Sequence, residues 1–314
     1  MSSIEKAISR LQNKKNGGAG STQKSTEPQE SVGEVFPEES CLDSSSTFTK
    51  EHVVSGRGEA PSVDNKSKSQ NKHITLDYVA LEQLGFITPV HKIEYLEEEY
   101  RVIKRPVLMN AFGKGAAPVP KGNLVMVTSS MPEEGKTFTS FNLAMSMASE
   151  LDLTVLLVDG DVIRASLSKT LNVEGYAGLT DILEGKAEGV EEVILSTDNP
   201  KLKIIPAGRR QSYSTELLAS DRMAYIAEEL SARYPDRIII FDAPPLLATT
   251  EATVLVNLMG QILLVVEAGK SKMHEVKAAL SNISDEKVVG LILNKSRKNA
   301  AGYYGGYYGG YAGK

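Results

Sequence analysis

The sequence predicts an α/β domain in which a mainly parallel sheet is covered by helices on both faces. Continuous apolar runs of strand length recur along the second half of the 314-residue chain, and helical patterns fill most of the gaps between them. Strands buried on both faces have continuous rather than alternating apolar residues, and parallel strands need a crossover connection that is usually a helix. We place this domain at residues 73–300.

Composition and charge limit the classes of function. The formal net charge of −5 argues against nucleic acid as a partner, because such binding usually needs a basic face. The single cysteine, Cys41, excludes an intramolecular disulfide, and the four histidines have no metal-ligand spacing. No apolar run is long enough to span a bilayer, and no export signal is evident. We therefore expect a cytoplasmic protein that reaches the inner membrane only through a partner.

The N-terminal region predicts little packed structure. Residues 2–13 place Ile4, Ala7, Ile8 and Leu11 at helical spacing, which indicates a short amphipathic helix. Residues 14–72 are rich in Ser, Glu, Lys, Asn and Gly and poor in large apolar residues, as is typical of a disordered linker.

The domain begins with two expected helices, Leu76–Phe86 and Ile93–Phe112, of which the first is ended by Gly85 and Pro89. Six expected strands follow: Leu124–Thr128, Thr154–Val158, Leu202–Pro206, Arg237–Phe241, Gln261–Glu267 and Val288–Leu293. The clearest helical patterns between them are Lys136–Leu151, Thr215–Arg233 and Lys272–Asn282.

The segment Thr128–Thr137 follows an expected strand and opens an expected helix, which is the context that a phosphate-binding P-loop requires. Gly135 lets the backbone approach phosphates, Lys136 can reach the β- and γ-phosphates, and the Thr137 hydroxyl can ligate Mg²⁺. The first position, normally glycine, is Ser130 here. The predicted nucleotide-binding residues of this segment are Ser130, Met131, Pro132, Glu133, Glu134, Gly135, Lys136, Thr137 and Phe138.

Three aspartates follow expected strands. Asp159 and Asp161 come after the second strand, and Asp242 comes after the fourth. The carboxyl ends of parallel strands meet at one edge of a sheet, where ligands bind. Together with the P-loop, these carboxylates predict an ATP site with Mg²⁺ held by Thr137, Asp161 and Asp242.

The C-terminal residues 301–314 form a Gly/Tyr tail beyond the last expected strand, and we interpret it as mobile. Five tyrosines lie within nine residues: Tyr303, Tyr304, Tyr307, Tyr308 and Tyr311. Taken alone, such a tail indicates low-complexity sequence without chemistry. Because the tail follows a domain with a predicted phosphate site, its tyrosines become candidate phosphoacceptors.

The three phosphate-site segments resemble the Walker A, Walker A′ and Walker B motifs of the bacterial tyrosine kinases, which are relatives of the MinD/ParA P-loop ATPases. The resemblance covers about residues 93–311 and includes Gly178–Leu183, Ile205–Gly208 and the tail. Glu98, Arg101 and Lys104 resemble the family's oligomerisation motif, with Lys in place of its last Arg. The first 13 residues and the segment Glu98–Pro106 resemble the autokinases of exosortase and exopolysaccharide loci.

The resemblance implies an ATP-dependent tyrosine autokinase that phosphorylates its tail in trans within an oligomer such as a ring. It implies that Asp159 helps to deprotonate the attacking tyrosine, while Asp161 and Asp242 hold Mg²⁺. Asn294 either contacts adenine, as in related ATPases, or forms a turn, and Arg164 has no assigned role. The implied partners are a second copy of the chain, a membrane-anchored polysaccharide co-polymerase as activator and a protein-tyrosine phosphatase.

Two other functions remain open on the sequence alone. One is a MinD/ParA-like ATPase that acts as a nucleotide-dependent positioning or regulatory switch. Against it, loop residues 129–134 lack a second lysine and the chain ends in Gly and Tyr rather than in an amphipathic helix. The other is a nucleotide-binding regulatory module with little turnover.

Overall fold

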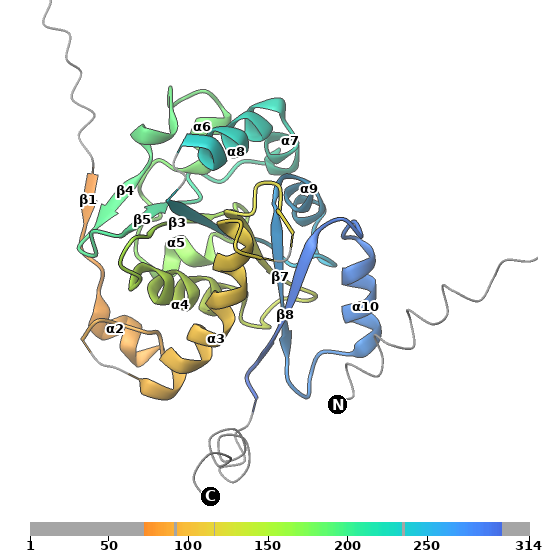
Figure 1. Cartoon of the computed structure of the whole chain (residues 1–314). Helices are drawn as coiled ribbons and strands as arrows, with labels where there is room; N and C mark the ends of the chain where they lie inside the picture. The colour runs from red at the N-terminus through yellow and green to blue at the C-terminus, as the bar shows by residue number, and fades with distance from the viewer. Residues whose placement is uncertain (1–71, 91–92, 116, 234–235, 297–314) are drawn as a thin grey trace, which may run out of the picture. The chain divides into compact units, whose positions relative to one another are not determined.

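The computed structural model describes residues 72–90, 93–115, 117–233 and 236–296 (Figure 1). The expected helix 2–13, nearly all of the expected linker 14–72 and the tail 301–314 lie outside these residues. No helix among those described combines the length and the apolar character needed to cross a membrane.

The described residues form an eight-stranded sheet with the order β1-β4-β5-β3-β6-β2-β7-β8. The strands are β1 (Lys72–Ile74), β2 (Leu124–Ser129), β3 (Thr154–Asp159), β4 (Leu195–Thr197), β5 (Leu202–Ile205), β6 (Arg237–Asp242), β7 (Gln261–Glu267) and β8 (Val288–Asn294). Every pair is parallel except β4 with β5, so the mainly parallel sheet is confirmed.

The helices are α2 (Tyr78–Gln83), α3 (Glu94–Ala111), α4 (Lys136–Ala148), α5 (Ser166–Thr170), α6 (Leu179–Leu183), α7 (Ser214–Leu218), α8 (Asp221–Arg233), α9 (Thr250–Leu258) and α10 (Met273–Ser281). A single 3₁₀ turn, η1, spans Val190–Glu192.

Helices cover both faces of the sheet, as the continuous apolar strands predicted. In β2, Val125 and Val127 face a core shared with α2, α3, α4 and α5. Leu124 and Met126 face the opposite core, which includes residues of α6, α8, α9 and α10. Successive residues of a strand point to opposite faces of the sheet. A strand that is packed on both faces therefore buries the side chains on each face and favours apolar residues along its whole length.

The structure adds elements that the sequence did not predict and divides one that it did. The strands β1 and β4 are three residues long and were not expected. The expected helix Thr215–Arg233 is two helices, because the Ser220 hydroxyl accepts a hydrogen bond from Met223 N (3.3 Å) and caps the start of α8. The expected helix 76–86 is shorter, and it ends before Gly85, whose φ is +82°.

Candidate active site

The P-loop connects β2 to α4, as predicted. Gly135 precedes the first residue of α4 with φ +97°, a conformation that favours glycine. A Cβ at this position would lie 1.9 Å from the Asn294 side-chain nitrogen. Glycine is therefore required at position 135 for two reasons: the backbone has a positive φ, and the Asn294 side chain at the end of β8 leaves no room for a Cβ.

Lys136 lies at the start of α4 and forms an ion pair with Asp161, with 2.9 Å between Nζ and Oδ2. Both side chains are buried. Burial alone would lower the pKa of Lys136, but the nearby carboxylates of Asp242, Asp161 and Asp159 outweigh it and raise that pKa. Lys136 therefore stays charged at the carboxyl edge of the sheet.

Asp242 ends β6 and accepts hydrogen bonds from two hydroxyls of α4. Thr137 Oγ1 donates to Oδ2 at 2.8 Å, and Ser140 Oγ donates to Oδ1 at 3.0 Å. Burial raises the pKa of Asp242 above its ordinary value, while the charge of Lys136 and these two hydroxyls oppose that rise. The predicted metal ligands Thr137 and Asp242 are thus in direct contact.

Asp159 ends β3 and lies beside Asp242 on the neighbouring strand β6. Its Oδ2 accepts hydrogen bonds from the Ser168 amide (2.8 Å) and the Ser168 hydroxyl (2.7 Å). Its Oδ1 accepts one from Asp161 N (3.3 Å). Burial, followed by the negative charge of Asp242, raises the pKa of Asp159 to about 7. The carboxyl group can therefore exchange a proton near neutral pH.

Sequence reasoning missed two serines that hold these carboxylates. Ser140 lies four residues after Lys136 and hence on the same face of α4, which is a signal that the sequence does contain. Ser168 lies in α5 and also accepts a hydrogen bond from Ala207 N (3.0 Å), so it connects Asp159 to the loop after β5. Only the tertiary structure reveals that second connection.

Asn294 does reach the nucleotide-binding loop, but its contact in this structure is with the loop backbone. Its Nδ2 donates to the carbonyl of Glu134 at 2.9 Å. The next residue, Lys295, donates from Nζ to the carbonyl of Glu133 at 2.6 Å. The Glu134 carboxylate in turn accepts hydrogen bonds from Met131 N and from the Ser271 hydroxyl. The end of β8 and the loop after β7 thus hold the P-loop in place through hydrogen bonds.

Other predicted nucleotide-binding residues have different surroundings. Phe138 packs its ring against Phe86, with 5.1 Å between ring centroids, so only its backbone is available to a phosphate. Met131 and Pro132 line a pocket together with Glu267, Lys270 and Ser271. Arg164 is exposed, and its amide donates to Asp161 Oδ1 at 3.2 Å.

These residues fit a magnesium nucleotide. Three buried carboxylates face one buried ammonium, an excess of negative charge that a divalent cation would offset. The buried hydroxyl of Ser130 in the P-loop has no hydrogen-bond partner among the described residues. Those residues contain no cluster of three or more acidic, His or Cys side chains arranged to hold a metal. Mg²⁺ is commonly held by one or two carboxylates, water and substrate phosphates, which matches Thr137, Asp161 and Asp242.

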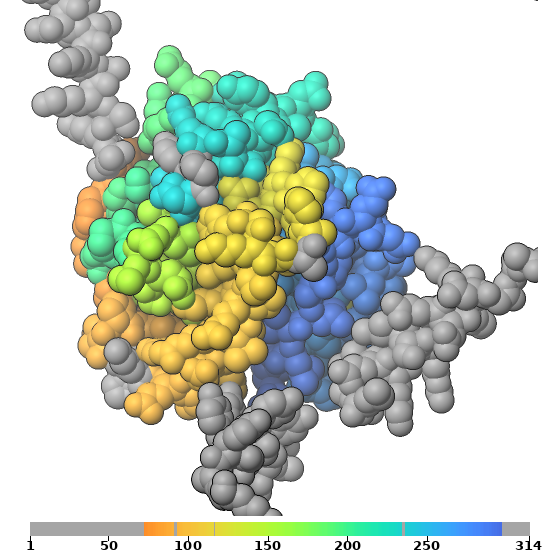
Figure 2. Space-filling view, in the orientation of Figure 1, coloured from red at the N-terminus to blue at the C-terminus, as the bar shows by residue number. Residues whose placement is uncertain are grey.

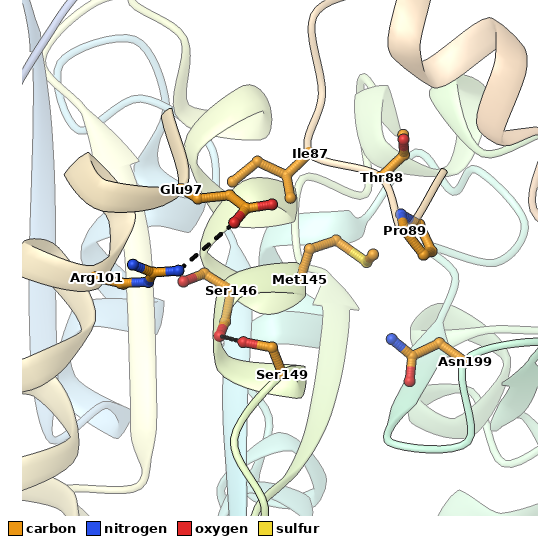
Figure 3. Close-up of a pocket in the computed structure, with 9 residues that line it drawn as sticks. All are labelled: Ile87, Thr88, Pro89, Glu97, Arg101, Met145, Ser146, Ser149 and Asn199. Carbon is orange, nitrogen blue, oxygen red and sulfur yellow. Dashed lines mark hydrogen bonds and ion pairs between the residues drawn. The ribbon is translucent and has the colours of Figure 1, made fainter. Parts of the chain in front are cut away.

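The three residues of the oligomerisation-like motif have different environments on α3, which lies on the surface in Figure 2. Arg101 is exposed and pairs with Glu98 (2.8 Å) and Glu97 (3.7 Å) of its own helix. Figure 3 shows Arg101 and Glu97 at a pocket of about 270 Å³ between α3 and α4. Lys104 is buried and bonds to Glu150 (2.5 Å) and to the Ser146 carbonyl (2.8 Å) at the end of α4.

Known proteins are similar to this chain in sequence and in fold. Residues 133–289 match the family model described as an AAA domain. Tyrosine-protein kinase ptk of Acinetobacter johnsonii is 35% identical over 185 residues, which are 58% of this chain and 25% of ptk. The chain therefore spans about a quarter of the length of that relative. Tyrosine-protein kinase CpsD of Streptococcus agalactiae is 30% identical over 217 residues, which are 68% of this chain and 92% of CpsD.

A solved structure agrees with these relatives. The kinase domain of the Escherichia coli tyrosine kinase ETK has a TM-score of 0.54 and 26% identity, over 67% of this chain and 80% of that domain. Its fold is therefore shared with the described residues. Because the match to CpsD extends over nearly all of that relative, this chain belongs to the family of bacterial tyrosine-protein kinases.

Proposed function

We propose that this chain is an ATP-dependent protein-tyrosine autokinase that phosphorylates its C-terminal tyrosine cluster in trans within an oligomer. The observation that carries the proposal is the meeting of Lys136, Thr137 and three strand-end aspartates at one sheet edge. Phosphoryl transfer depends mainly on positioning and on neutralisation of charge, and these groups can supply both.

Each group has a role in this proposal. Lys136 and the amides at the start of α4 bind the β- and γ-phosphates of ATP. Thr137, Asp161 and Asp242 hold Mg²⁺, which neutralises charge on the phosphates when it is bound. In this structure Lys136 pairs with Asp161, so we expect the phosphates of ATP to compete with Asp161 for the Lys136 ammonium. Ser140 fixes the orientation of Asp242.

Asp159 accepts the proton of the attacking tyrosine. A phenol has a pKa near 10, so its proton must leave as the new bond forms at neutral pH. The phenol oxygen bonds to the γ-phosphorus, the bond from that phosphorus to the bridging oxygen breaks, and ADP leaves with the electron pair. Ser168 holds the accepting carboxyl group from α5.

An apolar stripe on α3 supports self-association. Tyr95, Val102 and Met109 are 59%, 63% and 48% exposed. They are spaced by seven residues, so they lie along one side of the helix close to Glu98 and Arg101. Exposed apolar side chains aligned in this way are typical of a helix that packs against a partner. We propose a second copy of the chain as that partner and a ring as one form of the oligomer.

The biological setting follows from the resemblance to exopolysaccharide autokinases. We propose that the kinase regulates exopolysaccharide synthesis or export from the cytoplasmic side of the inner membrane. A membrane-anchored polysaccharide co-polymerase would activate it, and a protein-tyrosine phosphatase would reverse its phosphorylation.

Incubation with labelled ATP and Mg²⁺, followed by phosphopeptide mapping, tests the activity. The proposal predicts label on tyrosines 303–311 of the wild type and at least a hundredfold less on Lys136→Met. Release of inorganic phosphate without labelled tyrosine would support a MinD/ParA-like ATPase instead. Absence of both products would support a regulatory module.

A further inference from the structure

A groove of about 480 Å³ lies at the edge of the sheet that carries the catalytic aspartates. Its lining comes from loops and helix starts that follow three neighbouring strands. Ile163 follows β3 and Glu251 follows β6, while the lining residues that follow β5 are Arg210, Gln211, Ser212, Ser214 and Thr215. The helices α7 and α9, which supply Thr215 and Glu251, pack against each other (Figure 1).

The groove lies across the catalytic strands from the P-loop. In the order β5-β3-β6-β2, the P-loop follows β2, whereas the groove residues follow β5, β3 and β6. Asp159 and Asp242 end the two central strands of this set. The attacking and leaving oxygens of phosphoryl transfer are roughly in line, so an acceptor must approach from the side opposite the bound nucleotide. Because the groove is lined by residues that follow β5, β3 and β6 rather than β2, we infer that it lies on that side.

The groove wall is connected to the catalytic carboxylate. Ser168 bonds to Asp159 and accepts a hydrogen bond from Ala207 N, three residues before Arg210. On the far wall, the Thr215 hydroxyl donates to Glu251 at 2.6 Å. The first set of contacts connects the wall after β5 to Asp159, and the second joins α7 to α9 on the other wall.

Arg210 is the cationic side chain of the groove lining. It is exposed, and no hydrogen bond or ion pair engages its guanidinium among the residues that the structure describes. Its neighbour Arg209 is also exposed but lies 3.9 Å from Asp181 and does not line the groove. The two adjacent arginines therefore differ in what they can contact.

The sequence of the tail suits such a groove. Residues 303–311 contain only Gly and Tyr, so they offer aromatic rings, phenol hydroxyls and backbone amides but no charge. An arginine guanidinium can stack on an aromatic ring and attract its π face. The pairs Tyr303–Tyr304 and Tyr307–Tyr308 place a second ring beside each of four acceptors.

We propose that this groove binds the tyrosine-rich tail, with Arg210 stacked on the tyrosine next to the one being phosphorylated. The inference rests on the proposed kinase function, for which it supplies the site that recognises the acceptor peptide. Ile163 contributes apolar contact, and the polar wall accepts the peptide backbone.

Binding of a fluorescent peptide with the sequence of residues 302–314 tests the proposal. The protein is the full chain with its five tail tyrosines changed to Phe, together with Mg²⁺ and a non-hydrolysable ATP analogue. Arg210→Ala is expected to raise the Kd for the peptide about fivefold, and Arg210→Lys is expected to raise it less. Arg209→Ala is the matched control and should leave that Kd unchanged.

The outcomes separate this inference from the kinase function. Equal peptide Kd values for wild type and Arg210→Ala, or no binding by the wild type, would overturn the groove proposal. Parallel samples without the analogue are then given Mg²⁺ and labelled ATP. Arg210-dependent binding without label on the peptide supports the groove and counts against the kinase function. Label transfer to the peptide without any dependence of binding on Arg210 supports the kinase function and counts against the groove.

Discussion

At the residue scale, the site is governed by an excess of buried negative charge. Asp159, Asp161 and Asp242 are each at most 2% exposed, and Lys136 is the nearby cation, which forms an ion pair with Asp161. Unfolding would release Asp159 and Asp242, whose pKa values burial raises, into water, where each ionises near its ordinary pKa. The pH dependence of stability should therefore record their burial.

Asp159 provides the clearest pH prediction. Its pKa rises from an ordinary 3.8 to about 7 in the folded chain, so between these values the folded state holds a proton that the unfolded state has lost. The contribution of Asp159 to stability should therefore be greatest below about pH 4 and should be lost as the pH rises toward 7, by at most about 1.4 kcal/mol per pH unit. Denaturant unfolding of the nucleotide-free protein with a chelator measures this slope.

The matched variants are Asp159→Asn and Asp152→Asn. The first should flatten the slope, because it removes the titrating group. The second changes an exposed aspartate and should leave the slope as it is in the wild type. The same slope in all three proteins would show that the burial of Asp159 does not control it.

Gly135 gives a second prediction at this scale. Alanine at Gly135 would meet both a positive φ and the Asn294 side chain, whereas alanine at Gly113 (φ +69°) would meet no atom within 4 Å. We expect Gly113→Ala to cost about 1 kcal/mol of stability and to keep ATP affinity. Gly135→Ala should cost more and weaken ATP binding at least tenfold. Denaturation and nucleotide titration measure the two effects, and equal behaviour of the two variants would refute the contact with Asn294.

Much of the site could be predicted from the sequence because its residues are local to recognisable strand ends. The Gly135–Thr137 segment and the three aspartates each follow an apolar run, and parallel topology brings such positions together. The contact between Asn294 and Glu134 joins residues 160 positions apart. Neither spacing nor periodicity in the sequence predicts this contact. A turn and an adenine contact were therefore both consistent with Asn294 on the sequence alone.

At the scale of elements, the buried side chain of Lys104 connects α3 to the end of the P-loop helix α4. Its ammonium bonds to the Ser146 carbonyl and pairs with Glu150. A cation at a helix C-terminus is favourable, and a buried charged hydrogen bond contributes more than an exposed one. This intramolecular role was not expected from the sequence, which placed Lys104 in an oligomerisation motif.

Replacement of Lys104 by alanine should lower the free energy of unfolding by about 2 kcal/mol. Arg101→Ala removes only exposed pairs and should cost less than about 1 kcal/mol. Chemical denaturation of the two variants compares them directly. A larger loss for Arg101→Ala would contradict the assignment of Lys104 to the α3–α4 contact.

The strands that the sequence did not predict are short. The strands β1 and β4 have three residues each, too few for a periodic pattern, and they are defined by their pairing with each other and with β5. The break between α7 and α8 depends on capping by Ser220 within a continuous helical pattern. Long, fully buried strands such as β2 and β6 were predicted to within one residue because burial on both faces leaves a continuous apolar run.

At the scale of the whole molecule, the exposed stripe on α3 predicts how assembly should respond to mutation. Val102→Glu places a charge within the stripe and should reduce the oligomer mass measured by light scattering. Tyr225→Glu is the control, because Tyr225 is 67% exposed on α8, which packs on the other face of the sheet. Loss of the oligomer in both variants, or in neither, would exclude the stripe as the interface.

Phosphorylation should loosen the assembly. Each phosphotyrosine adds about −1.5 to −2 charge at neutral pH, so several in each tail repel one another and the acidic sites. We expect the unphosphorylated Lys136→Met protein to have a larger oligomer mass than the phosphorylated wild type. Equal masses would show that phosphorylation does not control assembly.

We propose that the sheet-edge site of one copy transfers phosphate to the tyrosine tail of another copy. The most direct measurement mixes Lys136→Met, which keeps its tail, with an active chain whose five tail tyrosines are Phe, and adds labelled ATP. We expect label on tyrosines 303–311 of the Lys136→Met chain, and none when the active chain is left out. An unlabelled Lys136→Met tail, in a mixture in which the active chain consumes ATP, would contradict this proposal.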